Sequence, residues 1–118
     1  MMTGFLDQIS ITFKALGDPK RLKILRLVAT RKHNFYVAEI AEKLGISSAA
    51  VSQHLKVLKN AGIVEPAREG YHTFYRMRKG AAENFRKNVD RLIRVGFLDC
   101  TFDGPCSECP EKGSCMKE

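Results

Sequence analysis

The stretch from residue 37 to residue 61 reads as two short helices joined by a tight turn, and it restricts the possible folds of this chain more than any other segment. The first helix is expected to end at Gly45, because glycine commonly follows the last turn of a helix. Ser47 or Ser48 can cap the second helix with a hydroxyl group. Ala41 is small enough for the two helices to cross closely. These features together indicate a helix-turn-helix, and the alternative is an ordinary corner between two helices within a core. The apolar stripe that would hold the second helix in place consists of Val51, Leu55 and Leu58.

The outward side of the second helix separates these two alternatives. Its side chains are short or carry hydrogen-bond donors and acceptors, and none is acidic; they are Ser48, Ala49, Ser52, Gln53 and Lys56. A solvated helix face typically mixes Glu with Lys. This set instead suits the edges of bases, since glutamine can pair with adenine, serine with a base edge or a phosphate, and alanine with the methyl group of thymine. We therefore predict that this helix enters the major groove of DNA. His54 lies on the same helix, where contact with a phosphate or packing is expected rather than metal binding.

A β-hairpin is expected directly after this helix pair. Two strand-like runs, residues 63–64 and 73–77, flank the turn signal Glu69-Gly70. The alternative is a solvated hairpin with incidental arginines, but a basic hairpin that follows a helix-turn-helix is typical of a DNA-contacting wing. Its basic side chains are expected to lie beside phosphates or in the minor groove. They are Arg68, His72 and Arg76.

Three further helices are expected around this unit. An apolar stripe at helical spacing predicts the first, and it consists of Phe5, Ile9, Phe13 and Leu16. Leu6 and Ile11 make this helix more apolar than one face of a small monomer requires. Asp18 and Pro19 mark the start of a helix that is expected to reach about Thr30, with a buried stripe of Leu22, Leu25 and Val28. The last helix carries Phe85, Val89, Leu92 and Ile93. The expected fold class is therefore mainly α with a small β-hairpin.

Length and charge favour a single domain with a polyanionic partner. The chain has 118 residues, which allow one domain with a short appendage. Lys and Arg number 20 against 13 Asp and Glu, a formal net charge of +7, and residues 14–32 alone carry seven basic and one acidic side chain. The sequence shows neither a long apolar membrane span nor a secretion signal, so we expect a cytoplasmic protein. Double-stranded DNA is favoured over RNA as the partner because no exposed aromatic platform is evident.

Three stretches carry a resemblance to a known family. Residues 13–25 read F-K-A-L-G-D-P-K-R-L-K-I-L, residues 37–64 read V-A-E-I-A-E-K-L-G-I-S-S-A-A-V-S-Q-H-L-K-V-L-K-N-A-G-I-V, and residues 68–77 read R-E-G-Y-H-T-F-Y-R-M. Together they resemble the ArsR (ArsR/SmtB) family of winged helix-turn-helix transcriptional regulators, over about residues 5–97. The resemblance implies a homodimeric repressor, not an enzyme, that binds a palindromic operator and releases it when an effector binds. It also implies that the N- and C-terminal helices form the dimer interface.

The usual metal sites of this family do not transfer to this sequence. Many members bind soft metals through a Cys-x-Cys pair on the helix before the turn, but residues 35–40 contain no cysteine. Other members bind zinc between C-terminal helices through Asp and His, but residues 80–97 contain no histidine. An effector site is therefore expected elsewhere in the chain.

All four cysteines lie within the last nineteen residues, with the spacing C-x5-C-x2-C-x5-C; they are Cys100, Cys106, Cys109 and Cys115. Four thiolates on one loop match tetrahedral zinc or a 4Fe–4S cluster. Only one C-x2-C knuckle is present, and the longer arms and the Cys-Pro step favour the cluster. Residues 106–115 also resemble the cysteine loop of small winged-helix proteins from ferrous-iron uptake systems, which implies iron–sulfur binding. Another soft ion, a dithiol/disulfide switch and an inert tail remain alternatives.

The cysteines divide the chain into one domain and an appended tail. Residues 1–97 are expected to form the winged helix-turn-helix domain for DNA binding and dimerisation, and residues 98–118 a metal- or cluster-binding tail with five acidic and two basic side chains. We predict that the bound metal or cluster sets the distance between the two recognition helices and so modulates operator affinity. One alternative is a purely structural zinc clip. Another is a thiol oxidoreductase that uses Cys106 and Cys109, although its usual βαβ context is missing.

Overall fold

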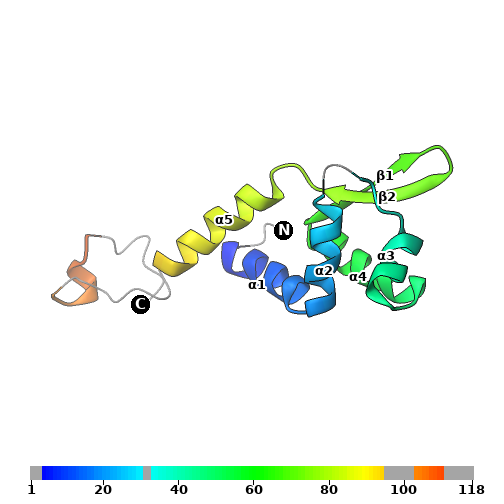
Figure 1. Ribbon diagram of the computed structural model, residues 1–118. Helices are drawn as coiled ribbons and strands as arrows, with labels where there is room; N and C mark the ends of the chain where they lie inside the picture. Colours follow the sequence, from blue (N-terminus) through cyan, green and yellow to red (C-terminus); the bar gives the residue numbers. More distant parts are fainter. Residues whose placement is uncertain (1–3, 31–32, 95–102, 111–118) are drawn as a thin grey trace.

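The computed structural model describes residues 4–30, 33–94 and 103–110. These residues contain five α-helices, a two-stranded antiparallel sheet and a short 3-10 turn. The elements are α1 (Phe5–Leu16), α2 (Pro19–Val28), α3 (Val37–Leu44), α4 (Ser48–Asn60), β1 (Val64–Glu69), β2 (His72–Met77), α5 (Ala81–Leu92) and η2 (Cys106–Glu108). Helices α3 and α4 and the hairpin lie at one end of the molecule, and α5 extends toward the other (Figure 1). The expected fold class is confirmed.

No helix in the described ranges combines the length and the apolar character that a membrane crossing requires.

Local sequence signals set the ends of the helices around the turn. Gly45 follows α3 with φ of +67°, a left-handed conformation that costs glycine no steric strain. The Ser47 hydroxyl oxygen accepts a hydrogen bond of 3.1 Å from the backbone N–H of Ala50 and so caps α4. At the start of α2, Asp18 accepts a bond of 2.8 Å from the N–H of Lys20, and this bond lowers the pKa of the Asp18 carboxyl. All three predicted boundaries are confirmed.

The core lies where α2, α3, α4 and the start of β1 meet. Its fully buried side chains are Ile24, Ile40, Val51, Leu55, Leu58 and Val64. The stripe expected on α4 is therefore confirmed. The stripe expected on α2 is wrong in one position, because Leu22 is 46% exposed. The buried residues of α2 are Val28, which belongs to that stripe, and Ile24 beside it.

Apolar side chains of α1 and α5 remain uncovered in the single protomer. Helix α1 buries Ile9 and Ala15, but Leu6, Ile11 and Phe13 are 40%, 48% and 43% exposed. Helix α5 is amphipathic, yet none of its residues is buried. The two helices touch through the rings of Phe13 and Phe85, which meet edge to face at 5.8 Å. Helix α1 therefore carries more apolar surface than its own protomer covers, as its sequence predicts.

The hairpin is longer than expected. Strand β1 runs to Glu69 through Pro66, whereas the sequence analysis assigned only residues 63–64 to it. Proline fits here because a strand in a two-stranded sheet has a free edge. Glu69 pairs with His72 across a two-residue turn, as the Glu69-Gly70 signal predicts. A single bridge from Tyr36 to Phe74, which the sequence analysis did not predict, attaches the segment before α3 to β2.

Candidate nucleic-acid interface

The predicted DNA-facing side chains of α4 all lie on its exposed side. Ser48, Ala49, Ser52, Gln53 and Lys56 are exposed. The opposite side of the helix is anchored in the core by Val51, Leu55 and Leu58. Within the described part of the chain, Ser52, Gln53 and Lys56 form no side-chain hydrogen bond or ion pair. A rigid helix therefore presents short and amide-bearing side chains without any acidic group, which is the surface that base edges require.

His54 occupies a different position from its neighbours on α4. Its ring is half-buried, and its Nδ1 accepts a hydrogen bond of 3.2 Å from Nε of Arg21 on α2. The sequence alone is compatible with either phosphate contact or packing for this residue. In the structure, Arg21 occupies one ring nitrogen of His54, and this partner was not identified from the sequence.

The basic residues of the hairpin are exposed, but they differ in their contacts. Arg68 lies in β1 near the tip. The ring of His72 lies 5.2 Å from the ring of Tyr36. Arg76 donates from Nε to a Glu65 carboxylate oxygen at 2.9 Å, in an exposed cross-strand ion pair. Since Glu65 already binds Arg76, a phosphate would have to compete for that arginine.

Tyr71 at the tip of the hairpin is almost fully exposed, at 98%. It was not among the predicted site residues. The sequence could have indicated this exposure, because Tyr71 directly follows Gly70 in the turn and a turn residue cannot reach the core.

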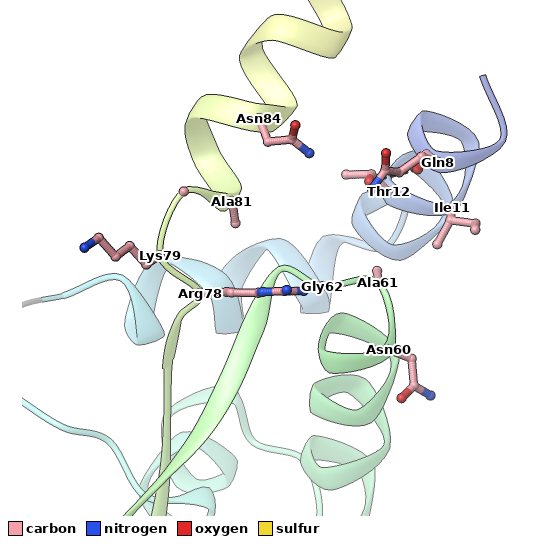
Figure 2. A pocket seen from close by; sticks show the side chains of 11 residues that line it. Gln8, Ile11, Thr12, Asn60, Ala61, Gly62, Arg78, Lys79, Ala81 and Asn84 are labelled. Atoms are coloured by element: carbon pink, nitrogen blue, oxygen red, sulfur yellow. Dashed lines mark hydrogen bonds between the residues drawn. The ribbon is translucent and has the colours of Figure 1, made fainter. Parts of the chain in front are cut away.

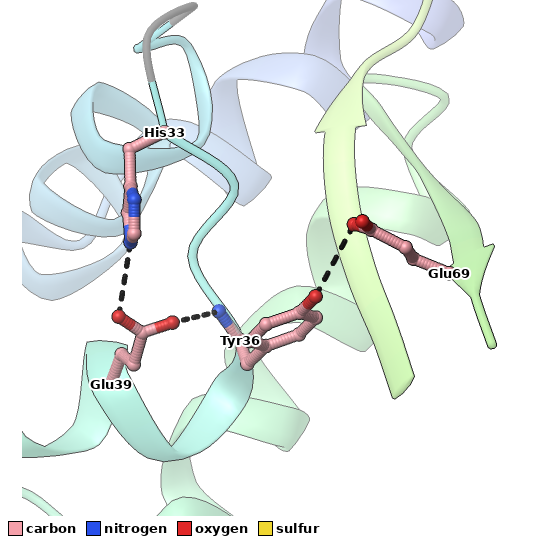
Figure 3. Close-up of polar contacts among 4 residues, drawn as sticks. All are labelled: His33, Tyr36, Glu39 and Glu69. Carbon is pink, nitrogen blue, oxygen red and sulfur yellow. Dashed lines mark hydrogen bonds and ion pairs between the residues drawn. The ribbon is translucent and has the colours of Figure 1, made fainter. Parts of the chain in front are cut away.

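A chain of polar contacts ties the hairpin to the start of α3 (Figure 3). The Tyr36 hydroxyl donates to a Glu69 carboxylate oxygen at 3.3 Å, and the Tyr36 backbone N–H donates to Glu39 at 3.2 Å. The other Glu39 oxygen lies 3.0 Å from Nε2 of His33. Partial burial, together with the Glu69 carboxylate, raises the pKa of Tyr36. We call Tyr36, Glu69 and the Tyr36–Phe74 bridge the wing clasp.

Glu39 is expected to make the stability of the fold depend on pH. The hydrogen bond with His33, followed by the Tyr36 N–H, holds the pKa of the Glu39 carboxyl below its usual range. A carboxylate whose pKa is lowered by folding stabilises the protein above its unfolded-state pKa, and this contribution is lost as the pH falls through the folded-state pKa. Glu39→Gln should therefore lower the urea midpoint near pH 7, and the difference from wild type should shrink below about pH 4.

The matched control for this prediction is Glu42→Gln. Glu42 is exposed on the same helix and forms no side-chain hydrogen bond or ion pair within the described residues. Its substitution should change the urea midpoint little at either pH. A Glu39→Gln difference that stays constant from neutral to acidic pH would contradict the prediction.

A polar groove of about 410 Å³ lies between α1, the end of α4 and the start of α5 (Figure 2). Gln8 and Thr12 line it from α1, Asn84 from α5, and Arg78 and Lys79 from the segment after β2. The Arg78 guanidinium lies against Gly62, where a Cβ atom would be only 3.0 Å from Nη1. The groove is thus next to the end of α4 but separate from its exposed polar face.

Two of the four predicted metal ligands can be placed. Cys106 is exposed and begins the η2 turn, Cys109 is partly buried and follows that turn, and both are free thiols. The N–H of Cys109 donates to the carbonyl of Cys106 at 3.1 Å. Cys100 and Cys115 lie outside the described residues. Among the described residues, no three His, Cys, Asp or Glu side chains are grouped to hold a metal ion. The two thiols are close in sequence, as soft-metal ligands on a short knuckle are.

Comparisons with known proteins agree with this architecture. Residues 18–66 match the model of the family described as bacterial regulatory protein, arsR family. An uncharacterized HTH-type transcriptional regulator from Methanocaldococcus jannaschii is 40% identical over 80 residues, which cover 68% of this chain and 89% of that protein. A homolog of the cadmium resistance transcriptional regulatory protein CadC from Staphylococcus aureus is 35% identical over 90 residues, which cover 76% of this chain and 68% of that protein.

A solved structure is similar over most of the chain. It is the homodimeric winged helix-turn-helix DNA-binding domain of a possible ArsR-family regulator from Mycobacterium bovis, with a TM-score of 0.60 and 30% identity. The match covers 87% of this chain and 100% of that domain. The position of the two helices at the turn, the hairpin that follows them and the matched sequences lead to one conclusion. This chain belongs to the ArsR family of winged helix-turn-helix regulators, which are DNA-binding proteins and not enzymes.

Proposed function

We propose that this chain is a homodimeric repressor whose two copies of α4 enter successive major grooves of a palindromic operator. The observation that carries the proposal is the exposed, acid-free face of α4, which is fixed from behind by the fully buried Val51, Leu55 and Leu58. The residues proposed to contact DNA on this helix are Ser48, Ala49, Ser52, Gln53, His54 and Lys56. In a helix-turn-helix protein, the N-terminal part of the second helix meets the base edges.

The hairpin is proposed to act as a wing that contacts the flanking DNA. Arg68 and His72 are exposed near its tip, and Arg76 is held in an exposed pair with Glu65. Phosphate contacts of this kind add affinity with little sequence preference.

Dimerisation is proposed to use α1 and α5. The exposed Leu6, Ile11 and Phe13 on α1 and the amphipathic α5, which buries nothing in the protomer, supply the apolar surface. The homodimeric state of the similar Mycobacterium bovis domain supports this arrangement. Residues 1–97 would then form one unit for DNA binding and dimerisation, acting on DNA in the cytoplasm.

The tail, residues 98–118, is proposed to hold a metal ion or an iron–sulfur cluster that modulates operator affinity. The ligands would be Cys100, Cys106, Cys109 and Cys115. Thiolates suit zinc and other soft ions as well as iron–sulfur clusters, and the accessible thiols of Cys106 and Cys109 fit this role. The name of the cadmium-resistance relative adds support for a metal effector. A structural zinc clip without a sensing role is the alternative.

A Gln53→Ala substitution tests the proposed DNA contact. A duplex is first selected from random DNA by the wild-type protein, and its affinity is then measured by fluorescence anisotropy. Loss of a bidentate contact with adenine should weaken binding by about 1–3 kcal/mol and relax the preference for that base pair.

Asn60→Ala is the matched control for Gln53→Ala. Asn60 is an exposed amide at the other end of the same helix, away from the N-terminal turns that meet the bases. Its substitution should change the affinity by less than about 0.5 kcal/mol. Equal affinities of wild-type and Gln53→Ala protein for the selected duplex would refute the assigned contact.

A further inference from the structure

We propose that Arg21 is a positioning residue for operator binding. It fixes α4 to the end of α1 and holds Nδ1 of His54, so that the other ring nitrogen, Nε2, can donate to a DNA phosphate. The inference rests on the proposed insertion of α4 into the major groove, and it adds a residue of α2 that does not itself belong to the DNA-facing surface.

The Arg21 side chain joins three helices. From α2, its Nη1 donates to the carbonyl oxygens of Lys14 at 3.0 Å and of Ala15 at 3.4 Å, and its Nε donates to Nδ1 of His54 at 3.2 Å. Both carbonyls lie in the last turn of α1, where a cation is favoured by the helix dipole. The Lys14 oxygen also accepts a hydrogen bond of 3.3 Å from the N–H of Gly17. The end of α1 therefore gives the guanidinium a defined place.

The planar guanidinium explains why an arginine suits this position. Its N–H groups point in fixed, different directions, so one group can serve the end of α1 while another serves α4. Arg21 and His54 are both half-buried, and their bond is therefore partly shielded from competing water. No other side-chain hydrogen bond connects α4 to another helix within the described residues.

The bond to Arg21 also determines which nitrogen of His54 carries the proton. Because Nε of Arg21 can only donate, Nδ1 of His54 must accept. In a neutral imidazole the proton then resides on Nε2, which becomes a donor. Phosphate oxygens only accept, so a neutral His54 held by Arg21 offers the group that a phosphate needs.

The same contact links the dimer interface to the helix that reads DNA. Helix α1 carries uncovered apolar side chains, and it is one of the two helices proposed to meet the partner protomer. Two recognition helices must lie about 34–36 Å apart to fit successive major grooves. By holding α4 against α1, Arg21 lets the orientation of α1 in the dimer set this separation.

A double-mutant cycle tests the proposal. Arg21→Met keeps the apolar stem and removes the guanidinium, and His54→Phe keeps a ring and removes both nitrogens. Each single variant should bind the selected duplex about tenfold more weakly, which is the size expected for losing one hydrogen bond to a charged group. The double variant should bind no more weakly than either single variant, because the two residues act through one contact.

Arg26→Met is the control for the loss of one positive charge. Arg26 is an exposed residue of the same helix and forms no side-chain hydrogen bond or ion pair within the described residues. The affinity of the Arg26→Met variant for the duplex should stay within about twofold of the wild-type affinity. Losses in the Arg21 and His54 variants that multiply to about a hundredfold in the double variant would overturn the proposal, as would wild-type affinity in Arg21→Met.

A spectroscopic measurement makes the inference independent of the variants and of DNA. A long-range 1H–15N correlation spectrum of the free wild-type protein should show the His54 proton on Nε2, and a proton on Nδ1 would overturn the proposal. Wild-type affinity in Gln53→Ala together with a non-additive Arg21–His54 cycle would refute only the assigned base contact. Weakened binding in Gln53→Ala with unchanged binding in Arg21→Met would refute only the positioning role.

Discussion

A Leu55→Ala substitution is expected to lower the free energy of unfolding by about 2–5 kcal/mol. Leu55 lies on the inner side of α4 and is 0% exposed, in a cluster that also contains Ile24 and Ile40. Truncation removes the favourable transfer of the side chain from water and leaves a cavity that the surrounding helices fill only in part. Urea unfolding followed by circular dichroism measures the change. A loss of this size would be a large share of the total stability of a small domain.

Lys56→Ala controls for the Leu55→Ala experiment. Lys56 is the next residue of the same helix, but it is exposed. Its substitution should change the unfolding free energy by less than about 0.5 kcal/mol and should weaken DNA binding instead. A loss below about 1 kcal/mol in Leu55→Ala would mean that the inner side of α4 is not the centre of the core.

Combined Cys106→Ser and Cys109→Ser substitutions are expected to abolish metal or cluster binding and to change operator affinity by about 5–150-fold. Both residues are free thiols, and Cys106 is exposed. Serine preserves the size of the side chain, but its hydroxyl is a poor ligand for soft metals. The measurement combines the visible absorption spectrum and the iron, sulfide and zinc contents of anaerobically purified protein with operator affinities of the wild-type and variant proteins.

The outcomes of this experiment separate the alternatives for the tail. A brown wild-type protein with iron and sulfide indicates a cluster, whereas a colourless protein with zinc indicates a zinc site. Loss of metal without a change in operator affinity would support the structural clip and contradict sensing. Ser107→Ala, between the two cysteines in the η2 turn, should leave both the metal content and the affinity unchanged.

The parts of the fold that sequence predicts well depend on interactions within a few residues. The caps of α2 and α4 form between Asp18 and Lys20 and between Ser47 and Ala50, and the end of α3 depends on the left-handed Gly45. Such contacts need no knowledge of the tertiary structure. Periodicity likewise predicted which side of α4 is buried, because one apolar stripe runs along that helix.

The parts that sequence did not predict depend on contacts between distant segments. The length of β1 follows from its pairing with β2, and the bond between Arg21 and His54 joins residues 33 positions apart. More than one side of α2 is apolar in sequence. The exposure of Leu22 therefore depends on how α2 packs against α3 and α4.

The candidate site also has parts that the sequence predicts and parts that depend on contacts between distant segments. The exposed set on α4 follows from helix geometry alone, so it could be predicted. The ion pair between Arg76 and Glu65 depends on the register of the hairpin, which places these two residues opposite each other. The contribution of Cys100 and Cys115 to a ligand set lies outside the described residues and stays a prediction.

The wing clasp has a mechanical consequence. Tyr36 joins the start of α3 to β2 by a backbone bridge and to the tip of β1 by its hydroxyl, so the hairpin cannot swing without disturbing the helix pair. In the proposed dimer, each protomer would therefore meet DNA as a single rigid unit, and the adjustable joint would lie between the two protomers. A signal that changes the angle at that joint would loosen base and backbone contacts together, giving an abrupt release instead of a gradual one.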